Sequence, residues 1–97
     1  MRTTVFAAAL LVVAAPAVAN GHYRAEPSAA PMNDRVLARG TVWTRDGATF
    51  QAAAGGSRPA TVCAAFVKEV GPLRSFAIAG TPVAAADLEK CNARARP

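Results

Sequence analysis

The chain has 97 residues and a formal net charge of +5, with eleven lysine and arginine residues against six aspartate and glutamate residues. This length excludes a multidomain protein, and the core of so small a domain is marginal. The basic residues are scattered along the chain, which favours a solvated surface and makes a nucleic-acid-binding face unlikely.

The N-terminus has the parts of a secretory signal peptide. A short basic start precedes an apolar run from Val5 to Ala15, and the small residues Ala17-Val18-Ala19 close it. We therefore predict a leader over residues 1–19 that is cleaved between Ala19 and Asn20. The run is shorter than the roughly 20 residues that a spanning helix needs. We expect a periplasmic or secreted protein that is not an integral membrane protein once the leader is removed.

The only two cysteines are expected to form a disulfide. Removal of the leader leaves residues 20–97, which are 78 residues and contain Cys63 and Cys91. In an oxidising compartment such a pair indicates a disulfide, worth about 3–4 kcal/mol for a loop of this length. The spacing excludes a CxxC redox centre, and the only histidine, His22, lies near the N-terminus. We expect no metal site and no cofactor.

The first half of the mature chain predicts an arm and a hairpin. Residues 20–34 contain two prolines and are interpreted as an extended arm. Polar and apolar residues alternate weakly over residues 22–26, which leaves a short edge strand as an alternative. Residues 35–44 (RVLARGTVWT) predict one strand because they are rich in β-branched and aromatic residues. Asp46-Gly47 predicts a turn into a returning strand over residues 48–52.

The second half predicts two helices around one strand. Ser57 is a candidate N-cap for a helix that ends at Gly71, and its apolar stripe includes Cys63. Residues 73–79 alternate as a strand, with Phe76 on the face opposite Leu73. Residues 84–94 predict a second, alanine-rich helix whose apolar side carries the second cysteine.

These elements predict a small α+β domain over residues 35–97. Its sheet would have three antiparallel strands, a hairpin plus one strand, packed by two helices and held by one disulfide. A right-handed crossover would place the third strand beside the first.

Several phrases of the sequence resemble a known family. The resemblance covers roughly residues 23–96 and is carried by AEP, TVW, SRPATVC, EVGPLRSF and EKCNARAR. The family consists of small exported proteins of unknown function from sphingomonad- and caulobacter-type alphaproteobacteria. Relatives carry a further cysteine pair around the hairpin after TVW, whereas Thr44–Thr49 holds none here. The resemblance thus implies a structural role for cysteines and supplies no activity.

No catalytic constellation is visible, and the candidate contacts are few. The carboxylates most open to a catalytic interpretation are Asp46, Asp87 and Glu89. Their positions in a turn and on a helix favour solvent-exposed charges over groups that do acid–base chemistry. The single tryptophan, Trp43, either contacts a partner or packs against the hairpin or a helix.

We therefore predict a non-enzymatic structural or interaction protein of the periplasm or envelope. Its partner would be an envelope protein or an anionic surface. The alternative is a weak anion or glycan-phosphate binder that uses Arg39 and Arg58 near the helix start at Ser57.

Overall fold

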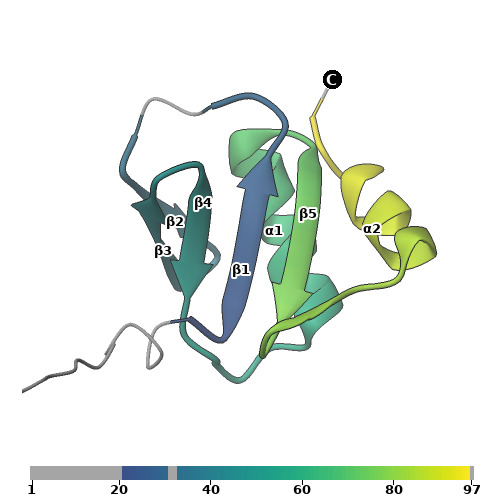
Figure 1. Cartoon of the computed structure of the whole chain (residues 1–97), viewed down its shortest axis with the longest axis horizontal. Helices are drawn as coiled ribbons and strands as arrows, with labels where there is room; N and C mark the ends of the chain where they lie inside the picture. The colour runs from purple at the N-terminus through teal and green to yellow at the C-terminus, as the bar shows by residue number, and fades with distance from the viewer. Residues whose placement is uncertain (1–20, 31–32, 97) are drawn as a thin grey trace, which may run out of the picture.

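The computed structural model describes residues 21–30 and 33–96, and within them the chain forms six strands and two helices. The strands form one antiparallel sheet in the order β2-β3-β4-β1-β5-β6. In chain order the elements are β1 (Tyr23–Pro27), β2 (Arg35–Ala38), β3 (Thr41–Asp46), β4 (Thr49–Ala52), α1 (Pro59–Val70), β5 (Leu73–Ile78), β6 (Thr81–Pro82) and α2 (Ala85–Asn92). Helix α1 lies behind the sheet in Figure 1, and α2 lies beside β5.

The predicted α+β class and the disulfide are confirmed, but the three-stranded sheet is wrong. The predicted strand order is wrong as well, because β5 lies between β1 and β6 and not beside the strand predicted over residues 35–44. One missing strand is β1, which lies within the stretch that we interpreted as an arm. It is neither a linker nor an edge strand, because it pairs with β4 on one side and with β5 on the other. Tyr23 and Ala25 point into the core and are 2% and 1% exposed. The burial of these two side chains explains why a weakly alternating segment forms the middle of the sheet.

The predicted single strand over residues 35–44 is divided into β2 and β3 by a tight turn. Arg39 and Gly40 both have positive φ angles, of 52° and 85°. Two such residues make the hairpin turn whose twist matches that of the flanking strands. The turn pairs Val36 with Trp43, and it brings Trp43 onto the helix-covered face.

The prediction that Leu73 and Phe76 lie on opposite faces of the strand is wrong, because β5 contains a bulge. Glu26 pairs with Ser75, but the next residue of β1 pairs with Leu73, so Arg74 is an extra residue in β5. An extra residue reverses the side on which the following side chains point. Both Leu73 and Phe76 are therefore buried in the same core.

The core lies between the sheet and the helices. Trp43 stacks on Phe66 of α1 with 4.0 Å between the ring centroids, and Phe50 meets the same ring edge-on.

The predicted helices are found, although Ser57 is not the N-cap of α1. Arg58 holds that position, without a side-chain hydrogen bond to the helix. Neither helix of the described part is long and apolar enough to cross a membrane.

Candidate functional site

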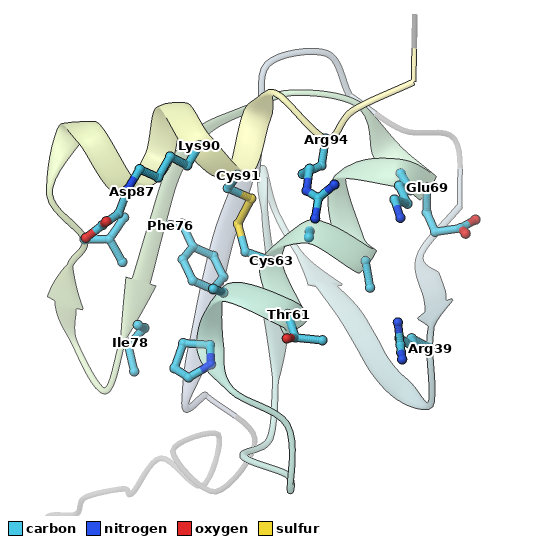
Figure 2. A pocket seen from close by; sticks show the side chains of 16 residues that line it. Arg39, Thr61, Cys63, Glu69, Phe76, Ile78, Asp87, Lys90, Cys91 and Arg94 are labelled. Carbon is cyan, nitrogen blue, oxygen red and sulfur yellow. A yellow bond between two sulfur atoms is a disulfide. The ribbon is translucent and has the colours of Figure 1, made fainter.

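The two helices and β5 enclose a groove on the helix-covered side of the sheet. Its volume is about 660 Å³, within the range of about 300–1,000 Å³ that is typical of small-molecule sites. Figure 2 shows the Cys63–Cys91 disulfide in the middle of this helix groove. The bond joins α1 to α2 with a Cα–Cα distance of 5.9 Å.

The floor and walls of the helix groove are apolar. Phe76 and Ile78 of β5 line it from below, and Val83 lies in the segment that leads into α2. On α1 the wall is formed by small side chains, among them Ala60 and Ala64. Alanine keeps the helix stable but fills little space, so the alanine-rich composition of this helix leaves the groove open.

The rim of the helix groove is charged and its balance is positive. Four cations line it (Arg39, Lys68, Lys90 and Arg94) against two anions (Glu69 and Asp87). All six residues are exposed. None of the four cations has an ion-pair partner among residues 21–30 and 33–96, where the recorded pairs are Arg45–Asp34 and Arg74–Glu26. The rim thus presents cationic groups that make no ion pair with a described carboxylate.

Arg39 reaches this rim from a strained backbone position. Its φ of 52° lies in the left-handed region, where glycine, asparagine and aspartate are the favoured residues. Its place in the β2–β3 turn sets it beside the first turn of α1, where Thr61 lines the same groove. The backbone conformation of the turn does not favour arginine. What distinguishes arginine from asparagine at this position is its longer, positively charged side chain.

Of the sequence-predicted residues, the two cysteines form the expected bond. Trp43 is 0% exposed, so its predicted contact with a partner is wrong and its alternative role in packing is correct. Arg39 lines the helix groove, whereas Arg58 and Ser57 are exposed and do not line it. The structure therefore does not join the two predicted arginines in one groove.

The other titratable side chains of the described residues do not form a cluster in the helix groove. Glu69 and Asp87 line opposite ends of the groove, on different helices (Figure 2). His22 contacts the Tyr23 ring edge-on and does not line the groove. Among the described residues there is no group of three histidine, cysteine, aspartate or glutamate side chains suited to a metal ion.

Sequence reasoning missed most of the rim. The basic residues of the sequence are interpreted only as scattered surface charge, and nothing in that interpretation singles out Lys68, Lys90 or Arg94. The signal was present in the positions of the cysteines, because Arg94 follows Cys91 by three residues and Lys90 directly precedes it. A disulfide between the two helices places these cations around one hollow, which sequence spacing within either helix does not reveal.

A second exposed apolar surface lies on the opposite side of the sheet. Leu37 and Val42 face each other across β2 and β3, and they are 66% and 47% exposed. No described helix covers this open face. The pair is small. Val42 also lines a second, smaller hollow of about 390 Å³ with Thr44 and Gln51, and that hollow contains neither the disulfide nor the rim cations.

The fold and the groove define a small disulfide-bonded α+β domain with a charged-rimmed groove on its helix-covered side. The chain belongs to the family of unknown function DUF8200, which matches residues 7–93. No curated protein and no solved structure shows a significant match to the chain.

Proposed function

We propose that this chain is an exported, non-enzymatic binding domain whose helix groove holds its ligand. The observation that carries the proposal is an apolar groove of about 660 Å³ with four cations on its rim and no ion-pair partner for them in the described chain. A groove that combines half-buried apolar side chains, Ile78 and Val83, with charges that make no ion pair favours a bound partner over bare solvent.

Export is supported by the leader and by the disulfide. Residues 1–19 lie outside the described residues, so the leader and its cleavage between Ala19 and Asn20 stay predictions. A disulfide is the state expected in an oxidising compartment such as the periplasm or the extracellular space. The alphaproteobacterial origin that the sequence resemblance implies is likewise a prediction.

The non-enzymatic reading rests on the arrangement of the groove's polar groups. Acid–base catalysis by paired carboxylates needs both groups within reach of one reacting centre. Glu69 and Asp87 lie at opposite ends of the groove and are exposed, so they do not form such a pair.

The alternative anion site at the start of α1 has less support. Arg58 is the N-cap of α1 but does not line the groove, and Ser57 makes no capping hydrogen bond. Both hypotheses include Arg39. Because Arg39 lines the rim of the helix groove, its position supports the groove over the anion site at the start of α1.

Site-specific photo-crosslinking in the native compartment tests the proposal. A photoreactive phenylalanine would replace Ala60 in the groove, Val42 on the open face or Ala86 on the exposed side of α2. We expect an adduct by intact mass at Ala60 and none at the other two. Adducts at Val42 instead, or at none of the three, would overturn the proposal.

A further inference from the structure

We propose that the ligand of the helix groove is a single-chain anionic amphiphile, meaning one acyl chain that ends in a carboxylate or a phosphate. The inference rests on the proposed function, because it names the ligand class for the same groove. Three features of the groove support it: its floor, the uneven charge of its ends and the lack of backbone partners.

The floor suits a hydrocarbon chain. Phe76 and Ile78 lie on one side of the disulfide in Figure 2, and they line the groove together with Val83 and the small side chains of α1. An acyl chain laid on this surface removes apolar area from water on both partners, at roughly 25 cal/mol per Å². Because Phe76 is only 4% exposed, the area that the chain would cover belongs mainly to Ile78, Val83 and Ala60, and free phosphate would leave it in water.

The charge of the rim differs between the two ends. At the end near Phe76 and Ile78, Asp87 and Lys90 lie one helical turn apart and carry opposite charges. The other end holds Arg94 and Glu69 (Figure 2), and Lys68 precedes Glu69 in α1, whereas Arg39 lies apart from them, toward the first turn of α1.

The second end thus has two cations, Lys68 and Arg94, against one anion. The Arg96 guanidinium also reaches this region, where its Nε donates a hydrogen bond of 3.1 Å to the Lys68 carbonyl. An amphiphile carries its single charge at one terminus, which matches a groove that is neutral at one end and cationic at the other.

An extended peptide fits the groove less well. A bound strand needs unpaired backbone donors and acceptors on its host. The floor strand β5 is already paired with β1 along its length and with β6 at Ala77 and Ile78. A peptide laid across the floor would bury its own amide groups without partners, which is costly. An acyl chain has no such groups.

Isothermal titration calorimetry of the mature disulfide-bonded protein tests the inference, with each amphiphile kept below its micelle concentration. Dodecanoate and dodecyl phosphate supply the same chain with the two candidate head groups, and the tighter of them identifies the head group. Dodecyl maltoside supplies the chain without charge, and acetate and inorganic phosphate supply the charge without the chain. We expect at least one charged amphiphile to bind on the order of tenfold more tightly than every control probe.

Variants locate the binding to the groove. Lys68→Gln with Arg94→Gln should weaken binding on the order of fivefold, because two exposed ionic contacts are lost. Arg35→Gln with Arg58→Gln removes the same charge away from the groove and should leave affinity unchanged. Ala60→Trp should obstruct the chain site, whereas Ala86→Trp on the exposed side of α2 should not. Circular dichroism checks that each variant is folded.

Two results would overturn the inference. One is equal affinity for the neutral and charged amphiphiles, or no binding of any of them. The other is equal loss in the groove pair and in the Arg35/Arg58 pair. If crosslinks at Ala60 lead to a protein while the amphiphiles fail to bind, the binding function of the groove stands and the ligand class proposed here is wrong.

Discussion

Single residues in this protein show how backbone and side-chain chemistry compete. The β5–β6 turn has Ala79 at a φ of 50° followed by Gly80 at 87°. Alanine is disfavoured in the left-handed region because its Cβ approaches the following carbonyl oxygen, whereas asparagine tolerates that region. The turn therefore forms because the flanking strands and the glycine require it, against the preference of the alanine.

We predict that Ala79→Asn stabilises the domain. The free energy of unfolding should rise by about 0.5–1 kcal/mol, because asparagine adopts this turn conformation more readily. Urea denaturation measures the change, and Ala54→Asn serves as the control, since Ala54 is exposed and its φ is not positive. A stability for Ala79→Asn at or below that of the control would contradict the account of the turn.

Asn92 fastens the end of α2 to the start of β5. Its amide oxygen accepts a hydrogen bond of 2.8 Å from the Leu73 N–H, and its amide nitrogen donates one of 3.0 Å to the Leu73 carbonyl. Leu73 is 3% exposed, so few other partners are within reach of its backbone. Asn92→Ala should lower the free energy of unfolding by about 1–3 kcal/mol.

Thermal denaturation of Asn92→Ala and of Glu89→Ala, an exposed substitution in the same helix, checks this contact. The glutamate variant should stay within about 0.5 kcal/mol of the parent protein. Equal effects of the two substitutions would mean that the Asn92 amide contributes nothing beyond its place in α2.

At the scale of elements, the sequence predicted those whose signals are local. Both helices, β5 and the Asp46-Gly47 turn follow from periodicity and turn residues. The Arg39-Gly40 turn was missed because arginine is an unusual residue at a positive φ. The bulge at Arg74 was missed because nothing in the residues 73–79 distinguishes it from regular alternation. Strand β1 was missed because its partners lie far away in the chain.

The central position of β1 gives a sharp prediction about truncation. A chain that starts at Asn20 should fold, whereas a chain that starts at Asn33 should not, because β4 and β5 lose the strand between them. Far-UV and near-UV circular dichroism distinguish the two outcomes. A folded, cooperatively melting chain without residues 20–32 would restore the interpretation of this stretch as a dispensable arm.

The disulfide is the other long-range connection between elements. It closes a loop with a sequence separation of 28 residues between α1 and α2. Replacing Cys63 and Cys91 together by alanine should lower the free energy of unfolding by about 3–4 kcal/mol on the chain-entropy model. Trp43 is fully buried and is the only tryptophan, so its fluorescence reports the unfolding. Unchanged stability in the double variant would show that the bond does not contribute to the stability of the fold.

At the scale of the whole molecule, one face of the sheet packs against the helices and forms the core, and no described helix covers the other face. The large aromatic side chains gather between the sheet and the helices, and the disulfide closes that layer at the helix groove. The groove could not be predicted from the sequence, because it depends on how two helices meet whose cysteines are 28 residues apart, and on which small side chains leave space between them. The cysteine pair indicated only that the helices would be joined.

The central claim is that the helix groove, rather than the open face, receives the ligand. Nuclear Overhauser contacts between bound dodecanoate and the methyl groups of the protein test it most directly. The account predicts contacts from the acyl chain to Ile78 and Val83, which line the groove. Contacts to Leu37 and Val42 instead would assign the binding surface to the open face and contradict the account.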